Sequence, residues 1–198
     1  MSCEDLTSLN LSSFDTSKVT NMSSMFYNCA GLTSLDVSNF DTSKVAYMSY
    51  MFNGCQSLTS LDVSNFDTPK VTNMEAMFRS CKNLISLNLS NFNTSQVTNM
   101  SHMFKDSGNL ISLNLSNFDT SQVTNVSGMF HNCTYLTSID FNQATFEKVT
   151  SFNDMFGGTN GNIYIVAKDD TARNWLQTRL DANQSLGTIV TVDEITSS

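Results

Sequence analysis

One stretch of the sequence recurs along the chain at a fixed spacing of 26 residues. Its clearest copy is the segment 32–54, LTSLDVSNFDTSKVAYMSYMFNG, which is followed by Cys55. Further copies, without insertion or deletion, begin at Leu58, Leu84 and Leu110, and looser copies begin at Leu6 and Leu136. A period of about 20–50 residues is typical of proteins in which each repeat packs only on its neighbours. The sequence therefore predicts a solenoid.

Each repeat contains a short segment with the alternation of a half-buried β-strand. In the clearest copy, Leu35 and Val37 would point inward, and Asp36 and Ser38 would point outward. Together with Leu32 they give the spacing LxxLxL of a leucine-rich repeat. Strands of successive repeats would then pair in a parallel sheet, about 4.8 Å apart.

The rest of the repeat predicts a corner followed by a short helix. Asp41 supplies an N-cap oxygen, and Val45, Met48, Met51 and Phe52 share one apolar helix face. The methionines are expected to fill the space between helix and sheet, with a metal-binding or partner-binding groove as the alternative. A regular column of phenylalanines is expected to form a buried aromatic spine at the corner: Phe14, Phe40, Phe66, Phe92 and Phe118.

These features predict an α/β fold, a leucine-rich-repeat solenoid of 26-residue strand-turn-short-helix repeats at residues 1–156. A glycine-rich break follows, and residues 157–198 are expected to form a small β-α-β cap over the end of the solenoid. Within this segment, a helix is predicted from Asp169 through Trp175 to Leu180, between two short strands. Trp175 is expected to pack against the solenoid.

The first repeat is truncated, because Met1 falls within the repeat pattern. This position predicts that the chain is a fragment to which Met1 was added. A natural solenoid begins with a cap over its first core layer. The uncovered layer of Leu6, Leu9 and Leu11 therefore predicts a site of self-association at the N-terminal edge.

Cysteines occupy one column of the repeat, that is, positions 26 residues apart in successive copies. All 5 cysteines belong to it: Cys3, Cys29, Cys55, Cys81 and Cys133. Ser107 and Thr159 occupy its two other positions, which indicates that a small buried residue is needed there. Side chains in register point the same way and five thiols cannot all pair, so we expect reduced thiols rather than disulfides. The spacing is not that of CxxC and no histidine is adjacent, so no metal site is predicted.

Composition and motifs argue against several classes of function. The formal net charge is -8, whereas nucleic-acid binding depends on clustered Lys and Arg. No apolar run reaches the length of a membrane span, and no nucleophile elbow, zinc-protease motif or phosphate-binding loop occurs. His102 and His131 fall in different columns and are expected to be ordinary surface residues. We therefore predict no enzyme activity, no cofactor and no nucleic-acid partner.

The repeat resembles that of the BspA-like leucine-rich repeat surface proteins of bacteria. The resemblance rests on the blocks FDTSKVTNM and MFxxC, which recur together at fixed spacing from Leu6 to Phe156. It implies a secreted or wall-attached protein with a role in adhesion or host contact. The sequence shows no signal peptide, wall-sorting motif or lipid-attachment context around Cys3. An extracellular or cell-surface location is therefore expected from the resemblance alone.

The outward positions of the predicted strands form the candidate binding face. This face consists of Ser34, Asp36, Ser38, Ser60, Asp62, Ser64, Ser86, Asn88, Ser90 and Asn114. Carboxylates of Asp36 and Asp62 on adjacent strands, about 4.8 Å apart, could hold Ca²⁺. A solvated Asp/Asn ladder that hydrogen-bonds along the sheet is the simpler interpretation. Ice binding by a flat hydroxyl array is a weaker alternative, because Ser alternates with Asp or Asn instead of forming Thr ladders.

Two functions remain for such a chain. The first is a non-enzymatic adhesion or ligand-binding module whose exposed sheet face contacts a host or matrix protein or a glycan. The second is a structural spacer within a longer surface protein, which the near-identity of the repeats favours. A specific site is expected to show departures from the repeat. The clearest are Ile85 and Ile111, which replace Thr, and the pair Tyr47 and Tyr50.

Overall fold

The computed structural model describes residues 3–184 and 186–196, which contain a four-stranded parallel sheet and helices near the C-terminus. The elements are β1 (Ser112–Asn114), β2 (Ser138–Phe141), β3 (Tyr164–Ala167), α1 (Asp170–Ala182), β4 (Thr188–Thr191) and α2 (Val192–Thr196). The strands lie in the order β1-β2-β3-β4, and Leu113 pairs with Ile139, which pairs with Ile165. These elements confirm the predicted α/β class. The prediction about Met1 lies outside the described residues.

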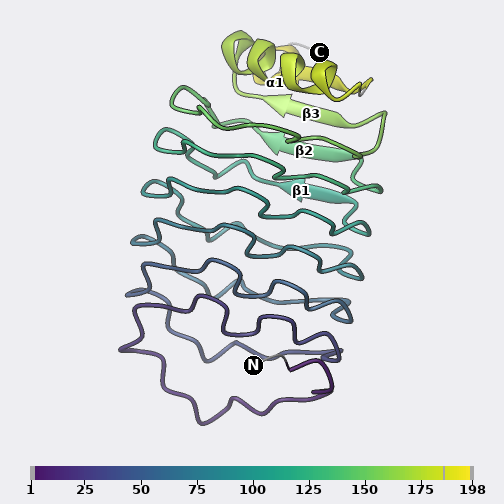
Figure 1. The fold of residues 1–198 in the computed structure, drawn as a ribbon. Coiled ribbons are helices and arrows are strands. Elements are labelled where there is room, and N and C mark those ends of the chain that lie inside the picture. Colours follow the sequence, from purple (N-terminus) through teal and green to yellow (C-terminus); the bar gives the residue numbers. More distant parts are fainter. Residues whose placement is uncertain (1–2, 185, 197–198) are drawn as a thin grey trace.

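Before β1 the chain winds through loops of similar outline that stack along one axis, and each is called a coil below (Figure 1). Isolated parallel bridges join the coils at positions 26 residues apart: Asn21, Tyr47, Asn73, Asn99, Asn125 and Ser151. The segments predicted as strands keep their alternation, with Leu35 and Val37 buried and Asp36 exposed. They are extended but not regular strands before β1, because the carbonyl of Val37 accepts from the side chain of Asn65 and from the N–H of Phe40. The prediction of a strand in every repeat is therefore wrong for the early coils.

The predicted short helix after Asp41 is also wrong. Residues 43–54 form turns around one isolated bridge. The N–H groups of Met48, Tyr50, Phe52 and Gly54 donate to the carbonyls of Asn73, Glu75, Met77 and Arg79 in the next coil, at 2.8–3.1 Å. The φ angles of Tyr50 (60°) and Gly54 (79°) are left-handed, which a right-handed helix excludes. A helix would satisfy these N–H groups within its own coil, whereas the turns use them to join coils.

The interior contains the apolar columns predicted from the sequence. Val45, Met48, Met51 and Phe52 are fully buried, although they lie on turns. The phenylalanines of the Met-Phe block form a face-to-face stack with ring centroids 5.6–5.9 Å apart: Phe26, Phe52, Phe78, Phe104, Phe130 and Phe156. The predicted spine is buried at Phe40, Phe66, Phe92 and Phe118. Phe14, in the first coil, is 54% exposed because a coil packs against it on one side only, which corrects the prediction for this residue.

Two kinds of polar side chain join successive coils. The buried hydroxyl of Thr42 donates to the carbonyl of Asp67 at 2.7 Å and accepts from the N–H of Asp67 at 2.8 Å. Nδ2 of Asn65 donates to the carbonyls of Val37 and Phe40, both at 3.0 Å. Equivalent contacts recur at Thr16, Thr68, Thr94, Asn39 and Asn117. Because buried backbone groups need such partners, these side chains hold each coil in register with the next.

The strand-helix-strand segment predicted near the C-terminus is present as β3, α1 and β4 (Figure 1). Asp169 is the N-cap of α1, where its Oδ1 accepts from the N–H of Ala172 at 2.9 Å. Trp175 stacks on Phe146 with ring centroids 4.5 Å apart, so it packs against the last coil as predicted. β3 pairs directly with β2, and the division into two domains at residue 157 stays a prediction. Residues 185, 197 and 198 of the predicted cap lie outside the described part.

Candidate functional site

The candidate face is accessible along the stack. Nine of its positions are exposed: Ser34, Asp36, Ser38, Ser60, Asp62, Ser86, Asn88, Ser90 and Asn114. Ser64 is half-buried. Each exposed side chain lies beside buried Leu or Val positions, so the face follows the alternation read from the sequence. Ligand binding by this face stays a prediction.

The carboxylates of this face take part in local turns. Oδ1 of Asp36 accepts from the N–H of Ser38 at 3.0 Å, and Oδ1 of Asp62 accepts from the N–H of Ser64 at 2.9 Å. Hydrogen bonds from the hydroxyl and the N–H of the same serine lower the pKa of each aspartate below its ordinary value. Asn88 makes the equivalent contact to the N–H of Ser90 at 3.1 Å. The Asp/Asn column therefore closes turns two residues ahead, rather than bonding along the sheet as expected.

The structure was searched for groups of at least 3 His, Cys, Asp or Glu side chains that could hold a metal ion. Among residues 3–184 and 186–196 it places no such group. In the same part of the chain, no helix is long and apolar enough to cross a membrane.

The clearest departure from the repeat is an exposed apolar patch beside the candidate face. Ile85 and Ile111 are each 50% exposed, and Tyr135 is 64% exposed. Together with Asn109 and Thr137 they line a hollow of about 440 Å³. The same columns hold Thr or Asn in neighbouring coils, so packing within the stack does not require these apolar side chains. This group, Ile85, Ile111 and Tyr135, is called the apolar patch below.

Tyr164 is a second departure, on the exposed side of the sheet itself. It begins β3 and is 41% exposed, at a station where the preceding coils hold serine. The strand register places it directly beside Ser138 of β2. With Asn114 and Asp140 it lines a hollow of about 390 Å³ over β1, β2 and β3. Sequence reasoning missed Tyr135 and Tyr164, and the signal that could have found them is the Asn and Ser that the earlier copies carry.

The other predicted pair, Tyr47 and Tyr50, does not form one site. Tyr47 is 50% exposed at a bridge position between coils. The Tyr50 hydroxyl donates to the carboxylate of Glu75, and this hydrogen bond raises the pKa of Tyr50 to about 12. Tyr50 also meets Tyr27 edge to face, with ring centroids 6.5 Å apart. These contacts give Tyr50 a role in joining coils.

The histidines differ from their prediction as plain surface residues. His102 and His131 are both half-buried, and the Nδ1 atom of each is buried without a hydrogen-bond partner. A Cβ at Gly128 would lie 2.5 Å from Nδ1 of His102, and one at Gly157 would lie 2.7 Å from Nδ1 of His131. Each ring therefore packs against a glycine one coil further on. Burial lowers the pKa of His102.

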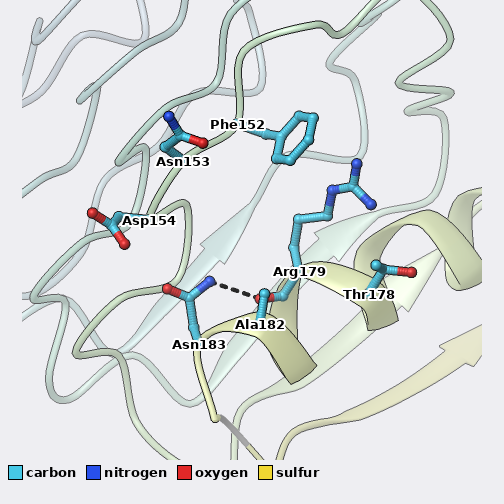
Figure 2. Close-up of a pocket in the computed structure, with 7 residues that line it drawn as sticks. All are labelled: Phe152, Asn153, Asp154, Thr178, Arg179, Ala182 and Asn183. Carbon is cyan, nitrogen blue, oxygen red and sulfur yellow. Dashed lines mark hydrogen bonds between the residues drawn. The ribbon is translucent and has the colours of Figure 1, made fainter.

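Another hollow, of about 510 Å³, lies between the last coil and α1 (Figure 2). The guanidinium carbon of Arg179 lies 4.0 Å from the centroid of the Phe152 ring and 4.2 Å from that of Trp175. Figure 2 shows the guanidinium group beside Phe152 and directed away from Asp154 and Asn183. Arg179 therefore attaches α1 to the last coil through cation–π contacts, and it does not offer its charge to the middle of the hollow.

The cysteine column is buried and free of disulfides, except that Cys3 is exposed. Sγ of Cys55 donates to the carbonyl of Phe26 at 3.2 Å, and the hydroxyl of Ser107 makes the equivalent contact to Phe78 at 2.7 Å. Burial raises the pKa of Cys55 to about 12. The prediction of reduced, buried thiols is confirmed for Cys29, Cys55, Cys81 and Cys133.

Comparison with known proteins gave one family. The family model described as Mycoplasma protein of unknown function, DUF285, matches residues 1–86 and 59–165. The search of curated proteins gave no match, and neither did the search of solved structures.

Proposed function

Because the chain belongs to the family described as Mycoplasma protein of unknown function, DUF285, we propose that it is a BspA-like surface repeat protein. We also propose that its stacked coils are a leucine-rich-repeat solenoid with a 26-residue repeat. Bonds between coils at separations of 25–29 residues support this, such as those of Thr42 and Cys55. An extracellular or cell-surface location is part of the same proposal.

The proposed function is non-enzymatic adhesion, in which the exposed sheet face and the apolar patch contact a host or matrix protein or a glycan. The apolar patch is the observation that carries this proposal. Ile85, Ile111 and Tyr135 are half exposed or more in columns where neighbouring coils carry Thr or Asn. Contiguous exposed apolar side chains rimmed by polar residues mark interaction sites, and aromatic side chains are enriched there. The predicted self-association through the first coil stays a separate prediction.

The test is binding of the whole chain, checked to be monomeric by light scattering, to immobilised extracellular-matrix proteins and glycans with and without calcium. The double variant Ile85→Thr/Ile111→Thr restores the residue of the neighbouring coils and should weaken a saturable interaction at least about tenfold. The matched control is Asp36→Asn/Asp62→Asn, which keeps the turn-closing oxygens of the face. Loss of binding in the control instead would place the ligand on the predicted carboxylates.

The structural spacer is the second candidate, and one observation favours it. Side chains of the candidate face already serve the fold, since Asp36, Asp62 and Asn88 close turns. A spacer needs only this regularity. If the folded chain binds nothing across the panel, the spacer is the better description and the adhesion proposal fails.

A further inference from the structure

The hollow over β1, β2 and β3 combines an exposed aromatic ring with hydrogen-bonding side chains. Tyr164 lies beside Ser138 in the strand register, and Asn114 lies beside Asp140. All four line the hollow of about 390 Å³. Adjacent strands are about 4.8 Å apart, so the amide of Asn114 and the carboxylate of Asp140 are close enough to contact one small ligand together.

Asn114 and Asp140 each have unused hydrogen-bonding capacity. Oδ1 of Asn114 accepts from the N–H of Ser116 at 3.0 Å, and Oδ1 of Asp140 accepts from the N–H of Asn142 at 3.0 Å. Within the described residues, Nδ2 of Asn114 and Oδ2 of Asp140 make no hydrogen bond. The local turns therefore fix both side chains and leave one donor group and one acceptor facing the hollow. A fixed donor beside a fixed acceptor loses little entropy on binding.

This arrangement matches the chemistry of a sugar ring. Each hydroxyl of a sugar both donates and accepts, so neighbouring hydroxyls can accept from an amide and donate to a carboxylate at the same time. The other face of a sugar ring carries C–H groups, which pack on an aromatic ring such as that of Tyr164. Val166, half-buried beside Tyr164, extends the apolar part of the hollow.

The charge of the hollow favours a neutral ligand. Its lining contains no Lys or Arg, and Asp140 is its one charged side chain. A carboxylated, sulfated or phosphorylated ligand would meet this carboxylate without a compensating cation. A peptide that adds a strand needs an open sheet edge, whereas β1, β2 and β3 present side chains here and pair their backbones with one another.

We propose that this hollow binds a neutral saccharide, with Tyr164 against the sugar ring and with Asn114 and Asp140 bonding its hydroxyls. The proposal rests on the proposed function, because it names the ligand class of the same exposed face. The apolar patch begins one residue away along the chain, since Ile111 precedes Ser112 and Thr137 precedes Ser138. A second sugar unit of an oligosaccharide would therefore reach it.

The test is an NMR titration of the isotope-labelled chain with methyl glycosides of glucose, galactose and mannose and with N-acetylglucosamine. Glucuronate and N-acetylneuraminic acid are the acidic comparison. Tyr164→Ser restores the serine of the column, and Asn114→Asp keeps the turn-closing oxygen while removing the amide donor. Each should weaken binding of a neutral sugar about tenfold or more. The matched control is Asn88→Asp, one coil earlier with the same turn and no tyrosine, which should change the Kd less than about twofold.

Three results would overturn the proposal: no neutral sugar binds, the acidic sugars bind better, or neither variant weakens binding. If a matrix protein still binds and Ile85→Thr/Ile111→Thr abolishes that interaction, the adhesion function stands and only the saccharide site is lost. Silence towards sugars and matrix proteins alike removes both. Because the two variants carry residues that the same columns hold in other coils, an unfolded protein is not the expected cause of lost binding.

Discussion

Thr68 joins two coils through a hydroxyl group that water does not reach. Its Oγ1 donates to the carbonyl of Asn93 at 2.9 Å and accepts from the N–H of Asn93 at 2.8 Å, and its side chain is fully buried. Thr68→Val keeps the shape of the side chain and removes both hydrogen bonds. An unsatisfied buried polar group costs about 1–3 kcal/mol, so two such groups close to the surface should lower the free energy of unfolding by about 2–4 kcal/mol.

The assay is urea unfolding followed by the fluorescence of Trp175. With a slope of about 3 kcal/mol per molar urea, the midpoint should fall by about 1 M while the slope stays the same. The matched control is Thr59→Val, because Thr59 is exposed and its hydroxyl makes no hydrogen bond within the described residues. The control should change stability by less than about 0.5 kcal/mol. If Thr68→Val proves as stable as the control, the hydroxyl bonds between coils add nothing to net stability.

Three further outcomes are expected. A thiol-reactive dye should label Cys3 alone in the folded protein, because Cys3 is exposed while burial raises the pKa of Cys55 to about 12; rapid labelling of a second thiol would contradict this. Gly54→Ala should lower the free energy of unfolding by about 1–2 kcal/mol in thermal melts, since φ is 79° and a Cβ would lie 2.8 Å from a neighbouring asparagine oxygen. Gly161→Ala, whose Cβ would meet nothing within 4 Å, is the control and should be neutral. An NMR pH titration should place the pKa of Asp62 below its ordinary 3.8 because a serine donates to it. Its stabilising contribution is then present above the unfolded-state pKa and is lost as the pH falls through the folded-state pKa, and Asp62→Asn should remove this part of the acid sensitivity.

The strand alternation and the cap could be predicted from the sequence because each depends on a local pattern, but the helix could not. Val45, Met48 and Phe52 fit one face of a helix, and they fit equally well the turns that bury them. A missed signal was available at the second left-handed position of each coil, where φ is positive. That position holds Asn28, Gly54, Ser80, Asp106, Asn132 and Gly158. Five of these are Asn, Asp or Gly, the residues that adopt left-handed φ most readily.

The candidate site was predicted in part. Exposure of the Asp36 column followed from alternation, but its bond to the next serine N–H depends on a turn that the assumed strand concealed. Ile85 and Ile111 were recognised as departures because they lie inside well-aligned copies. Tyr164 was not, because it follows a glycine-rich break, and only the pairing of β2 with β3 aligns it with Ser138.

In a stack of similar coils, each column shows what packing requires at that position. Ser107 replaces a cysteine, and its hydroxyl still donates to the carbonyl of Phe78, so the coil-to-coil contact survives the change. Columns that face solvent carry no such requirement, and an exposed Ile111 or Tyr164 gains little by packing while it lowers solubility. A ligand supplies the reason that the fold does not. Stability and binding should therefore separate: Ile111→Thr and Tyr164→Ser should weaken binding at unchanged unfolding, whereas Thr68→Val should do the reverse.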